Sequence, residues 1–536
     1  MTDHPVQKPT RVRRWRLDRT FSSVVIFVAA AIVSYVLTRT TDRLDHDYQN
    51  VISGVTLVVA GLLLAAWFWV RSPVSVFWKI TVPLVALVGL GACVRVDDYT
   101  ADMKITLAWR FVPRPDERLA PAASEVDNVS IQAPVASGRD YPRFLGSGGR
   151  AAAPDVQLAT NWIDNPPRPM WRQPIGAGWS AFAVVGNYAV TQEQRGEQEL
   201  VVCYELTTGR IVWSHADAAR FVDPLAMGGV GPRATPTIDG DRVYTQGATG
   251  ILNCLDFADG GRIWSRNIIA ENGARQIQWG RSGSPLVVDN LVVVSAGGAE
   301  GKSLVAYDKA TGEPVWSAGS DQCSYASPIV TTLAGTRQVV TVNEDHVRGH
   351  RLEDGQELWS YAWPGDSGGS ANTSQPVPLS GDRVLVSKGY GQGCAVLQVR
   401  SKTEAEQTVS ELWRSEKSLK TKMSNVVVYK DHIYGLSGGI LECVRIDGLK
   451  RAWKRGRYGH GQLMLVGDLL LVLSEKGELA LVRASPEKFD EVTTFQVLDD
   501  KTWNNPALAG DYLLVRNHLE AACYQLPLEN NDQASE

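Results

Sequence analysis

Eight short polar segments recur from residue 178 onward, each directly before a run of β-forming residues. They read GWS (178–180), RATP (233–236), RSGSP (281–285), YASP (325–328), TSQP (373–376), KMSN (422–425), HGQ (460–462) and WNNP (503–506). Their cationic, aromatic and amide side chains are Trp179, Arg233, Arg281, Tyr325, Gln375, Lys422, Asn425, His460, Gln462, Trp503 and Asn505. Cations combined with aromatic rings suit an anionic or aromatic ligand. Ser, Thr and Asn in the same segments have a second interpretation, because they also satisfy backbone groups in turns.

A repeated hairpin pattern predicts the elements that bring these segments together. The best copies read CYELTTGRIVW (203–213), CLDFADGGRIW (254–264), AYDKATGEPVW (306–316), GHRLEDGQELW (349–359) and CVRIDGLKRAW (443–453). In each copy a small residue stands ten positions before the Trp. Alternating apolar residues, a polar turn with Gly and a second apolar run predict a β-hairpin. Weaker anchors at Trp171, Trp413 and Phe495 extend the series to eight.

The spacing of these anchors predicts the fold. They follow one another at intervals of 40 to 54 residues, and each interval holds a second pair of β-rich runs. Four strands per repeat at this period indicate a β-propeller. We therefore expect an all-β, eight-bladed propeller over residues 141–527, followed by a disordered tail at 528–536. The strand around Trp171 would complete the C-terminal blade and so remove an exposed sheet edge.

The repeats resemble the AxDxxTGxxxW repeats of quinoprotein-like propellers. That family includes quinone-dependent alcohol dehydrogenases and the lipoprotein of the outer-membrane barrel-assembly machinery. Catalytic and non-catalytic members share these turns, so the resemblance implies the fold rather than an activity. The segment YPRFLGSGGR (141–150) also resembles the start of the repeat region in bacterial membrane-anchored propellers of unassigned function. WD-type repeats need a Trp-Asp ending and a Gly-His opening, and neither recurs here.

The first 94 residues predict an α-helical transmembrane anchor. Residues 21–38 and 51–70 are uncharged apolar stretches of membrane-spanning length, and 74–94 is a third candidate that carries Lys79 and Pro83. The alternative for the third stretch is a buried amphipathic segment. Residues 1–20 hold six cations against two aspartates, which predicts a cytoplasmic basic tail. Three spans would then place the propeller in the periplasm behind a linker at 95–140, making this a multi-pass inner-membrane protein.

Composition agrees with a folded body on an anchor. The chain has 536 residues, a net charge of −4, 21% charged residues and 49 glycines, and nothing in it indicates nucleic-acid binding. Cys203, Cys254 and Cys443 occupy the small-residue position of the repeat, so we expect core thiols there and at Cys523. The remaining cysteines, at 93, 323 and 394, have no assigned partner, so no disulfide framework is predicted.

The sequence lacks the motifs of several common classes of enzyme. It has no adjacent cysteines, CxxCH, HExxH or P-loop, and the eight segments contain no Asp or Glu. His346 and His350 lie on a strand-rich stretch, too far apart for one zinc ion, and are expected at the surface.

Two functional hypotheses follow. The first is a membrane-anchored periplasmic binding or scaffold module without a cofactor, which binds a protein partner or ligand. The alternative implied by the resemblance is an oxidoreductase dependent on pyrroloquinoline quinone and calcium, with an altered site. Trp279 or Trp503 would then stack on the quinone, and Arg281 or Lys422 would pair with its carboxylates. Long connections at 215–231, 266–280 and 362–372 would form a lip over the segments in either case.

Overall fold

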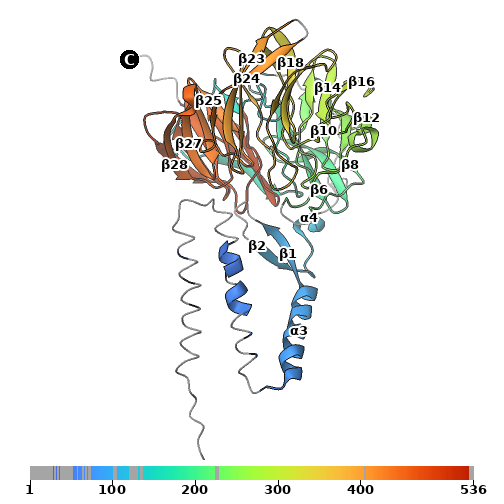
Figure 1. The fold of residues 1–536 in the computed structure, drawn as a ribbon, viewed down its shortest axis with the longest axis vertical. Helices are drawn as coiled ribbons and strands as arrows, with labels where there is room; N and C mark the ends of the chain where they lie inside the picture. The colour runs from blue at the N-terminus through green and yellow to red at the C-terminus, as the bar shows by residue number, and fades with distance from the viewer. Residues whose placement is uncertain are drawn as a thin grey trace, which may run out of the picture. The chain divides into compact units, whose positions relative to one another are not determined.

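The structure is a computed structural model with two compact units, Met1–Arg110 and Phe111–Glu536. It describes residues 28, 32, 36, 52–56, 58–62, 66, 69, 74–99, 105–119, 131–132, 137–223, 228–403 and 406–529. The predicted helices at 21–38 and 51–70, the basic tail at 1–20 and most of the tail at 528–536 lie outside these residues. We describe each unit by itself (Figure 1).

The first unit contains one long apolar helix, α3 (Val76–Cys93), followed by the antiparallel strands β1 (Val94–Tyr99) and β2 (Ile105–Trp109). Among the described residues, α3 is the one helix long and apolar enough to cross a membrane. None of its side chains is buried, which argues against the alternative of a buried amphipathic segment. The predicted linker at 95–140 thus contains a hairpin, and also the short helix α4 (Pro115–Arg118) of the second unit.

The second unit is an eight-bladed propeller of four-stranded antiparallel sheets. Blade 1 contains β5 (Ala183–Val185), β6 (Tyr188–Arg195), β7 (Gln198–Glu205) and β8 (Ile211–Asp217). Blade 2 contains β9 (Thr237–Asp239), β10 (Arg242–Gln246), β11 (Ile251–Asp256) and β12 (Arg262–Asn267), followed by α5 (Ile268–Glu271). Blade 3 contains β13 (Leu286–Val288), β14 (Leu291–Ser295), β15 (Leu304–Asp308) and β16 (Pro314–Ala318). Blade 4 contains β17 (Ile329–Leu333), β18 (Thr336–Val342), β19 (His346–Arg351) and β20 (Glu357–Ala362).

The second half of the ring repeats this order. Blade 5 contains β21 (Val377–Leu379), β22 (Arg383–Lys388), β23 (Gly393–Ser401) and β24 (Gln407–Ser415). Blade 6 contains β25 (Val426–Tyr429), β26 (His432–Ser437), β27 (Ile440–Arg445) and β28 (Arg451–Arg457), with a 3-10 turn at Asp447–Leu449. Blade 7 contains β29 (Gln462–Val466), β30 (Leu469–Leu473), β31 (Glu478–Arg483) and β32 (Glu491–Gln496). Blade 8 contains β33 (Ala507–Ala509), β34 (Tyr512–Arg516), β35 (Glu520–Gln525) and the early strand β4 (Arg168–Pro174).

The pairing of β4 with β35 closes the ring, as the sequence predicted. Trp171 lies opposite Cys523 in this pair. In seven blades the Trp lies opposite a residue of the third strand that directly precedes a register shift. The other pairs are Cys203 with Trp213, Cys254 with Trp264, Ala306 with Trp316, Gly349 with Trp359, Val396 with Trp413 and Cys443 with Trp453. In blade 7 Thr493 takes that position, opposite Leu481, and Phe495 lies two residues farther along, opposite Leu479. The eight-bladed propeller predicted from the anchors is therefore confirmed.

Five of the eight anchors also join their blade to the next, whereas Trp359 donates to Gln338 Oε1 in its own blade. The indole N–H of Trp316 donates to the backbone oxygen of Leu352 in blade 4 at 3.0 Å. Equivalent bonds run from Trp171 to Leu206, Trp213 to Phe257, Trp264 to Lys309 and Trp453 to Ser485. The face of the Trp316 ring covers the turn glycine Gly355, where an added Cβ would lie 2.5 Å from the ring. We call this arrangement the Trp dock.

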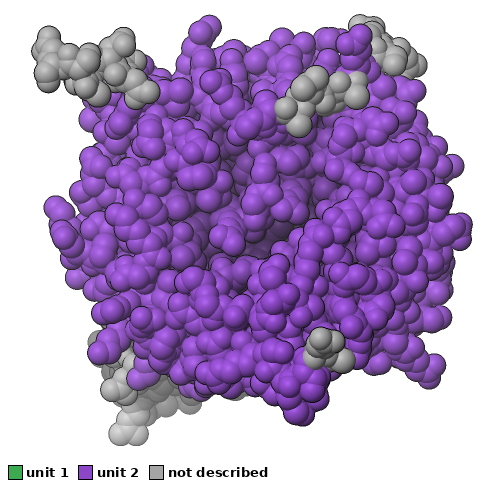
Figure 2. All heavy atoms as spheres, turned by 90° about the horizontal axis from the view of Figure 1, so that it is seen from above, with its two compact units in different colours: residues 1–110 green, residues 111–536 purple. Residues whose placement is uncertain are grey.

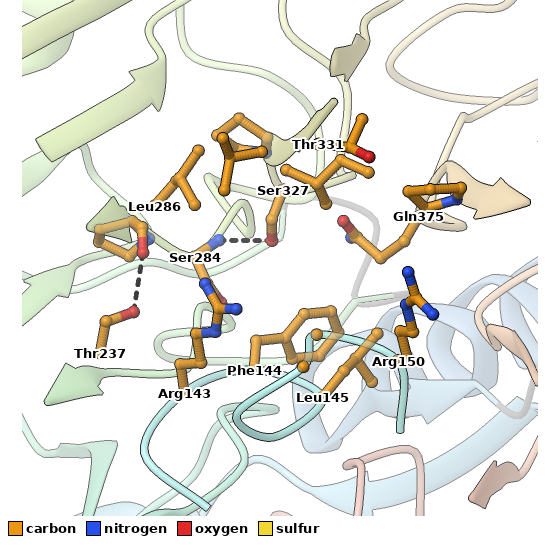
Figure 3. Close-up of a pocket in the computed structure, with 17 residues that line it drawn as sticks. Arg143, Phe144, Leu145, Arg150, Thr237, Ser284, Leu286, Ser327, Thr331 and Gln375 are labelled. Atoms are coloured by element: carbon orange, nitrogen blue, oxygen red, sulfur yellow. Dashed lines mark hydrogen bonds between the residues drawn. The ribbon is translucent and has the colours of Figure 1, made fainter. Parts of the chain in front are cut away.

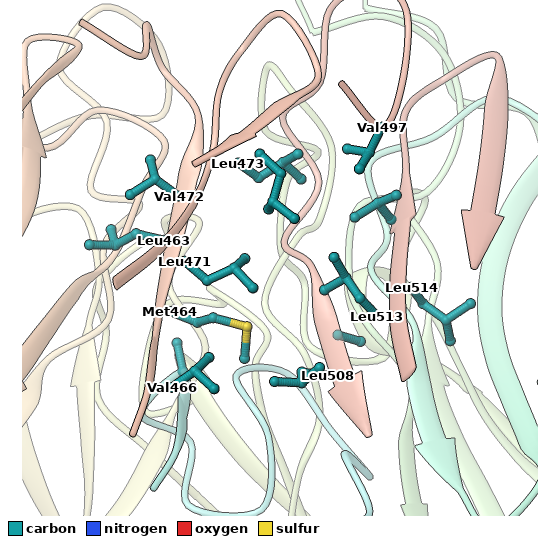
Figure 4. Close-up of a cluster of buried hydrophobic side chains, with 14 of the residues drawn as sticks. Leu463, Met464, Val466, Leu471, Val472, Leu473, Val497, Leu508, Leu513 and Leu514 are labelled. Carbon is teal, nitrogen blue, oxygen red and sulfur yellow. The ribbon is translucent and has the colours of Figure 1, made fainter. Parts of the chain in front are cut away.

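Buried apolar side chains fill the spaces between blades. The largest cluster joins blades 6, 7, 8 and 1. Figure 4 shows Met464 of blade 7 pointing toward Leu508 of blade 8 within it. All seven cysteines are free, and six of them are buried. The predicted core positions Cys203, Cys254, Cys443 and Cys523 are fully buried.

Before the first blade, the chain crosses the central channel. We call residues 141–155 the channel segment. Tyr141 forms a bridge with Val184 of β5, and the oxygen of Pro142 accepts from the N–H of Ile238 in β9. Farther along, β3 (Ala152–Ala153) pairs in parallel with β29. The segment therefore contacts inner strands on different sides of the channel, at the end where these strands turn back.

The Trp dock predicts a difference between two glycine substitutions in blade 4. Gly355 and Gly335 have φ values of +74° and +78°, so alanine costs each roughly 1 kcal/mol. Only Gly355 contacts a Trp ring, whereas nothing lies within 4 Å of an added Cβ at Gly335. We expect Gly355→Ala to lower the free energy of unfolding by about 1–3 kcal/mol more than Gly335→Ala. Urea unfolding of the full-length protein in detergent, followed by Trp fluorescence, measures this; equal losses would contradict the dock.

Candidate functional site

The eight predicted segments each lie directly before an inner strand of the propeller, and we call them the ring. Their small polar side chains link neighbouring blades. The N–H of Thr235 donates to Ser284 Oγ at 2.9 Å, and the N–H of Ser284 donates to Ser327 Oγ at 2.8 Å. Similar bonds run from the N–H of Ala181 to Thr235 Oγ1 and from the N–H of Gln375 to Asn425 Oδ1. The backbone-satisfying interpretation therefore holds for these hydroxyls and for the Asn425 amide.

The ring amides are also largely committed to backbone groups. Gln462, 1% exposed, donates to the oxygens of Met423 and Trp503 at 2.7 and 2.8 Å. Asn505 is half-buried, and its neighbour Asn504 donates to the oxygen of Ser180 at 2.8 Å across the closing junction. Asn504 thus links blade 8 to blade 1, a role that the sequence did not reveal.

Two ring tryptophans, from the first and the last ring segments, meet at the junction of blades 8 and 1. The rings of Trp179 and Trp503 lie 4.8 Å apart between centroids. Lys501 Nζ lies 4.1 Å from the Trp503 ring centre and 4.9 Å from that of Trp179, and its side chain is almost fully buried. The His518 ring lies 5.4 Å from Trp179. We call these four residues the Lys501 stack; such cation–π contacts are strongest when desolvated.

An acidic side chain supports the stack from outside the ring segments. Glu475, in the turn between β30 and β31, accepts from the indole N–H of Trp503 at 2.9 Å through Oε1. Its Oε2 accepts from the backbone N–H of His460 at 3.1 Å. The ring segments contain no acidic residue, as the sequence showed, but the folded ring has a carboxylate beside it.

Arg233 links the ring to the first long connection, residues 215–231, by hydrogen bonds. Its Nη2 donates to the oxygens of Gly228 and Gly229 at 2.7 and 3.1 Å, and its guanidinium lies 4.4 Å from the Phe221 ring centre. Trp179 also donates to the oxygen of Gly228, at 2.6 Å. Burial lowers the pKa of Arg233 to about 10, and nearby Asp223 partly opposes that change.

A second cluster forms where the other two long connections meet. The Tyr325 hydroxyl donates to the oxygen of Ser367 at 2.6 Å and accepts from the N–H of Trp279 at 3.1 Å. The Trp279 and Tyr325 rings lie 5.2 Å apart. All three long connections therefore contact ring residues and form the expected lip. Lys422 Nζ lies 5.4 Å from the Tyr390 ring on the far side of this cluster.

Arg281 does not face an open site. It is 1% exposed, its Nη2 donates to the oxygen of Arg275 at 2.7 Å, and its Nη1 contacts Cys323 Sγ. Arg281 therefore does not fit the role of pairing with the carboxylates of pyrroloquinoline quinone, and Trp503 is already covered by Trp179 and Lys501. The other residues named for these roles, Lys422 and Trp279, contact Tyr390 and Tyr325. Among the described residues, no cluster of three or more His, Cys, Asp or Glu side chains could hold a metal ion.

One minor expectation is wrong. His350 is 1% exposed, and its Nδ1 contacts the oxygen of Gly355 at 3.0 Å, whereas His346 is half-buried. A register shift between Gly349 and His350 breaks the alternation of β19 and turns His350 inward.

Comparison with known proteins places the fold in a family. A family model described as "Outer membrane protein assembly factor BamB" matches residues 163–277 and 197–455. The chain belongs to this PQQ-repeat propeller family. No curated protein matches the chain in a sequence search.

Solved structures of PQQ-repeat propellers are similar in fold. Quinohemoprotein alcohol dehydrogenase from Comamonas testosteroni has a TM-score of 0.54 at 13% identity, covering 78% of this chain and 84% of that one. Quinohemoprotein alcohol dehydrogenase ADHIIG from Pseudomonas putida HK5 has the same score and identity, with 75% and 84% covered. BamB from Moraxella catarrhalis is matched over its full length and over 67% of this chain, at 14% identity and a TM-score of 0.48.

A buried carboxyl near Arg233 gives a pH-dependent prediction. Glu199 is 4% exposed and accepts from the N–H of Ala248 at 3.1 Å, and burial raises its pKa from 4.5 to about 7. Because the folded state holds this proton more tightly, the group's contribution to stability is present below pH 4.5 and is lost as the pH rises through 7. We expect Glu199→Gln to be more stable than wild type by about 3 kcal/mol at pH 8 and nearly equal at pH 4.5.

Urea unfolding at both pH values measures this difference. The matched control is Glu197→Gln, because the Glu197 side chain is 87% exposed on the same hairpin and should leave the pH dependence unchanged. A Glu199→Gln protein with the wild-type pH dependence would show that Glu199 is ionised in the folded state.

Proposed function

We propose that the protein is a membrane-anchored, non-catalytic scaffold in the periplasm whose ring and lip bind a protein partner. The observation that carries this proposal is that the large side chains of the ring are committed to contacts within the protein. They contact one another or the lip: the Lys501 stack at the junction of blades 8 and 1, Arg233 against Phe221, and Trp279 against Tyr325. A small substrate or cofactor needs a concave site with converging free groups. A surface of interlocked Trp, Tyr and Arg side chains suits a protein interface instead.

The lip offers an accessible apolar contact to such a partner. Val222 lies in the connection that Arg233 and Trp179 hold, and it is 39% exposed. It pairs with Val230 through an isolated bridge, so its position is fixed rather than left to a loose loop. The description of the matching family, an outer membrane protein assembly factor, supports a role in binding proteins.

The proposed location rests on the anchor. Three spans, at residues 21–38, 51–70 and 76–93, with a basic cytoplasmic tail, would place the propeller in the periplasm at the inner membrane. Of these, α3 is supported by its length, apolar composition and lack of burial.

Reporter fusions test this topology. Alkaline phosphatase, which is active only in the periplasm, is fused after Asp45, Ser72 or Asp140 in a bacterial host. We expect high activity at Asp45, low activity at Ser72 and high activity at Asp140, because each span reverses the side of the membrane. Low activity after Asp140 would contradict a periplasmic propeller, and low activity after Asp45 would contradict the first span.

Site-specific photocrosslinking tests the partner surface. A photoreactive residue replaces Val222 on the lip or, as the control, Val315, which is 50% exposed on the outer strand β16. In intact cells we expect one discrete protein adduct from position 222 and none of the same mass from position 315. Adducts shared by both positions, or no adduct from position 222, would contradict partner binding at the ring.

A further inference from the structure

The channel segment and the inner strands enclose a cavity that also reaches the ring residues Gln375 and Asn425. Residues 141–150 pass beneath these strands and, with blades 5, 6 and 8, enclose about 620 Å³. A smaller cavity of about 90 Å³ adjoins it toward blades 2 to 4. Both cavities share Leu145, Arg150, Gln375 and Pro378 as lining residues. Figure 2 shows one face of the propeller with a hollow at its centre. The larger cavity has the volume of a small-molecule site.

The walls of the two cavities carry a positive charge in an otherwise acidic chain. Four cations line them: Arg139, Arg143, Arg150 and Lys430. The two acidic lining residues are Asp140 and Asp155, which leaves an excess of two positive charges. Asp140 is already used, since it accepts from the N–H and hydroxyl of Ser137 and from the N–H of Gly186.

Two of the arginines face the cavity without an anionic partner. Arg143 donates to the backbone oxygens of Gly146 and Ser147, and burial alone lowers its pKa. Arg150 is exposed to the cavity, and no ion pair of either arginine is found among the described residues. Figure 3 shows both side chains rising from the same loop toward the inner strands, on either side of Phe144 and Leu145. A half-buried cation without a counter-charge is costly, which favours an anionic ligand.

A buried polar group points to a ligand independently of these charges. Gln375 is 5% exposed, lines both cavities, and has no hydrogen-bond partner for Oε1 among the described residues. Its backbone N–H is used by Asn425, so the side-chain amide is not needed to hold the turn. Figure 3 shows this amide extending into the smaller cavity near Arg150. Either face of an amide can be turned to a ligand, so it can donate to an oxyanion.

We propose that the two adjoining cavities bind a small organic oxyanion, with a carboxylate or phosphate head where they meet and an apolar body in the larger one. Arg143, Arg150 and the Gln375 amide hold the head through charge-assisted and neutral hydrogen bonds. Apolar side chains of Val377, Leu379, Val426 and Leu508 line the rest of the larger cavity and contact the body. The cavity shares Gln375 and Asn425 with the ring, and the rest of its lining comes from the channel segment and from blades 5, 6 and 8.

Calorimetric titration of the full-length protein in detergent tests this site. The probes are phenyl phosphate and benzoate, which carry the two heads on one ring, and phenol, which has the ring without the anion. We expect saturable binding of at least one anion and none of phenol; the tighter anion identifies the head. Arg150→Gln should weaken that binding about tenfold, and Gln375→Leu should weaken it severalfold.

The matched control is Arg457→Gln, an exposed arginine at the end of the outer strand β28, which should bind as wild type does. Arg150 is exposed, so its loss should leave the unfolding temperature unchanged, and a thermal melt of each variant checks this. The proposal is overturned if neither anion saturates, if phenol binds as well as the anions, or if Arg150→Gln binds like wild type.

Discussion

The Trp dock is the contact on which the rest of the propeller depends. The indoles of Trp171, Trp213, Trp264 and Trp316 each lie across the turn glycine of the next blade and donate to a backbone oxygen there, as Trp316 does to Leu352. This contact fixes both the spacing and the rotation of adjacent sheets, and it costs no buried unpaired N–H. Hydrogen bonds between ring segments, such as that from the N–H of Thr235 to Ser284 Oγ, add further contacts between neighbouring blades.

The sequence predicted the elements that neighbouring residues encode, and it missed contacts between residues that are far apart in the sequence. A hairpin with Gly in its turn and Trp at its end is encoded within eleven residues, so the blades could be counted from their anchors. The count is correct for blade 7 although Thr493, not Phe495, occupies the Trp position there. The sequence did not predict three residues of the site, Lys501, His518 and Glu475, because they lie outside the aligned segments. Lys501 is nevertheless only two residues from Trp503. The path of residues 141–155 depends on contacts with strands hundreds of residues away, and no local pattern encodes it.

The ring and the cavities beside the channel segment differ in a way that bears on function. At the ring, cations are matched by aromatic faces, backbone oxygens and nearby carboxylates, as with Arg233 and the Lys501 stack. At the channel segment, Arg143 and Arg150 face a cavity without such partners. An interlocked surface is suited to a large partner, and a positively charged cavity is suited to a small anion. The quinoprotein dehydrogenases with similar folds therefore share the framework of this chain without defining its chemistry.

The central claim is that the ring of this PQQ-repeat propeller is a protein-binding surface rather than a cofactor site. Calorimetric titration of the full-length protein with pyrroloquinoline quinone and calcium tests it most directly. Because the channel cavity also accepts organic anions, the titration is run with wild type and with Arg150→Gln. We predict no calcium-dependent binding to either protein. Saturable, calcium-dependent binding that persists in Arg150→Gln and is lost in Arg281→Ala would contradict the claim. It would indicate that the ring binds a quinone cofactor.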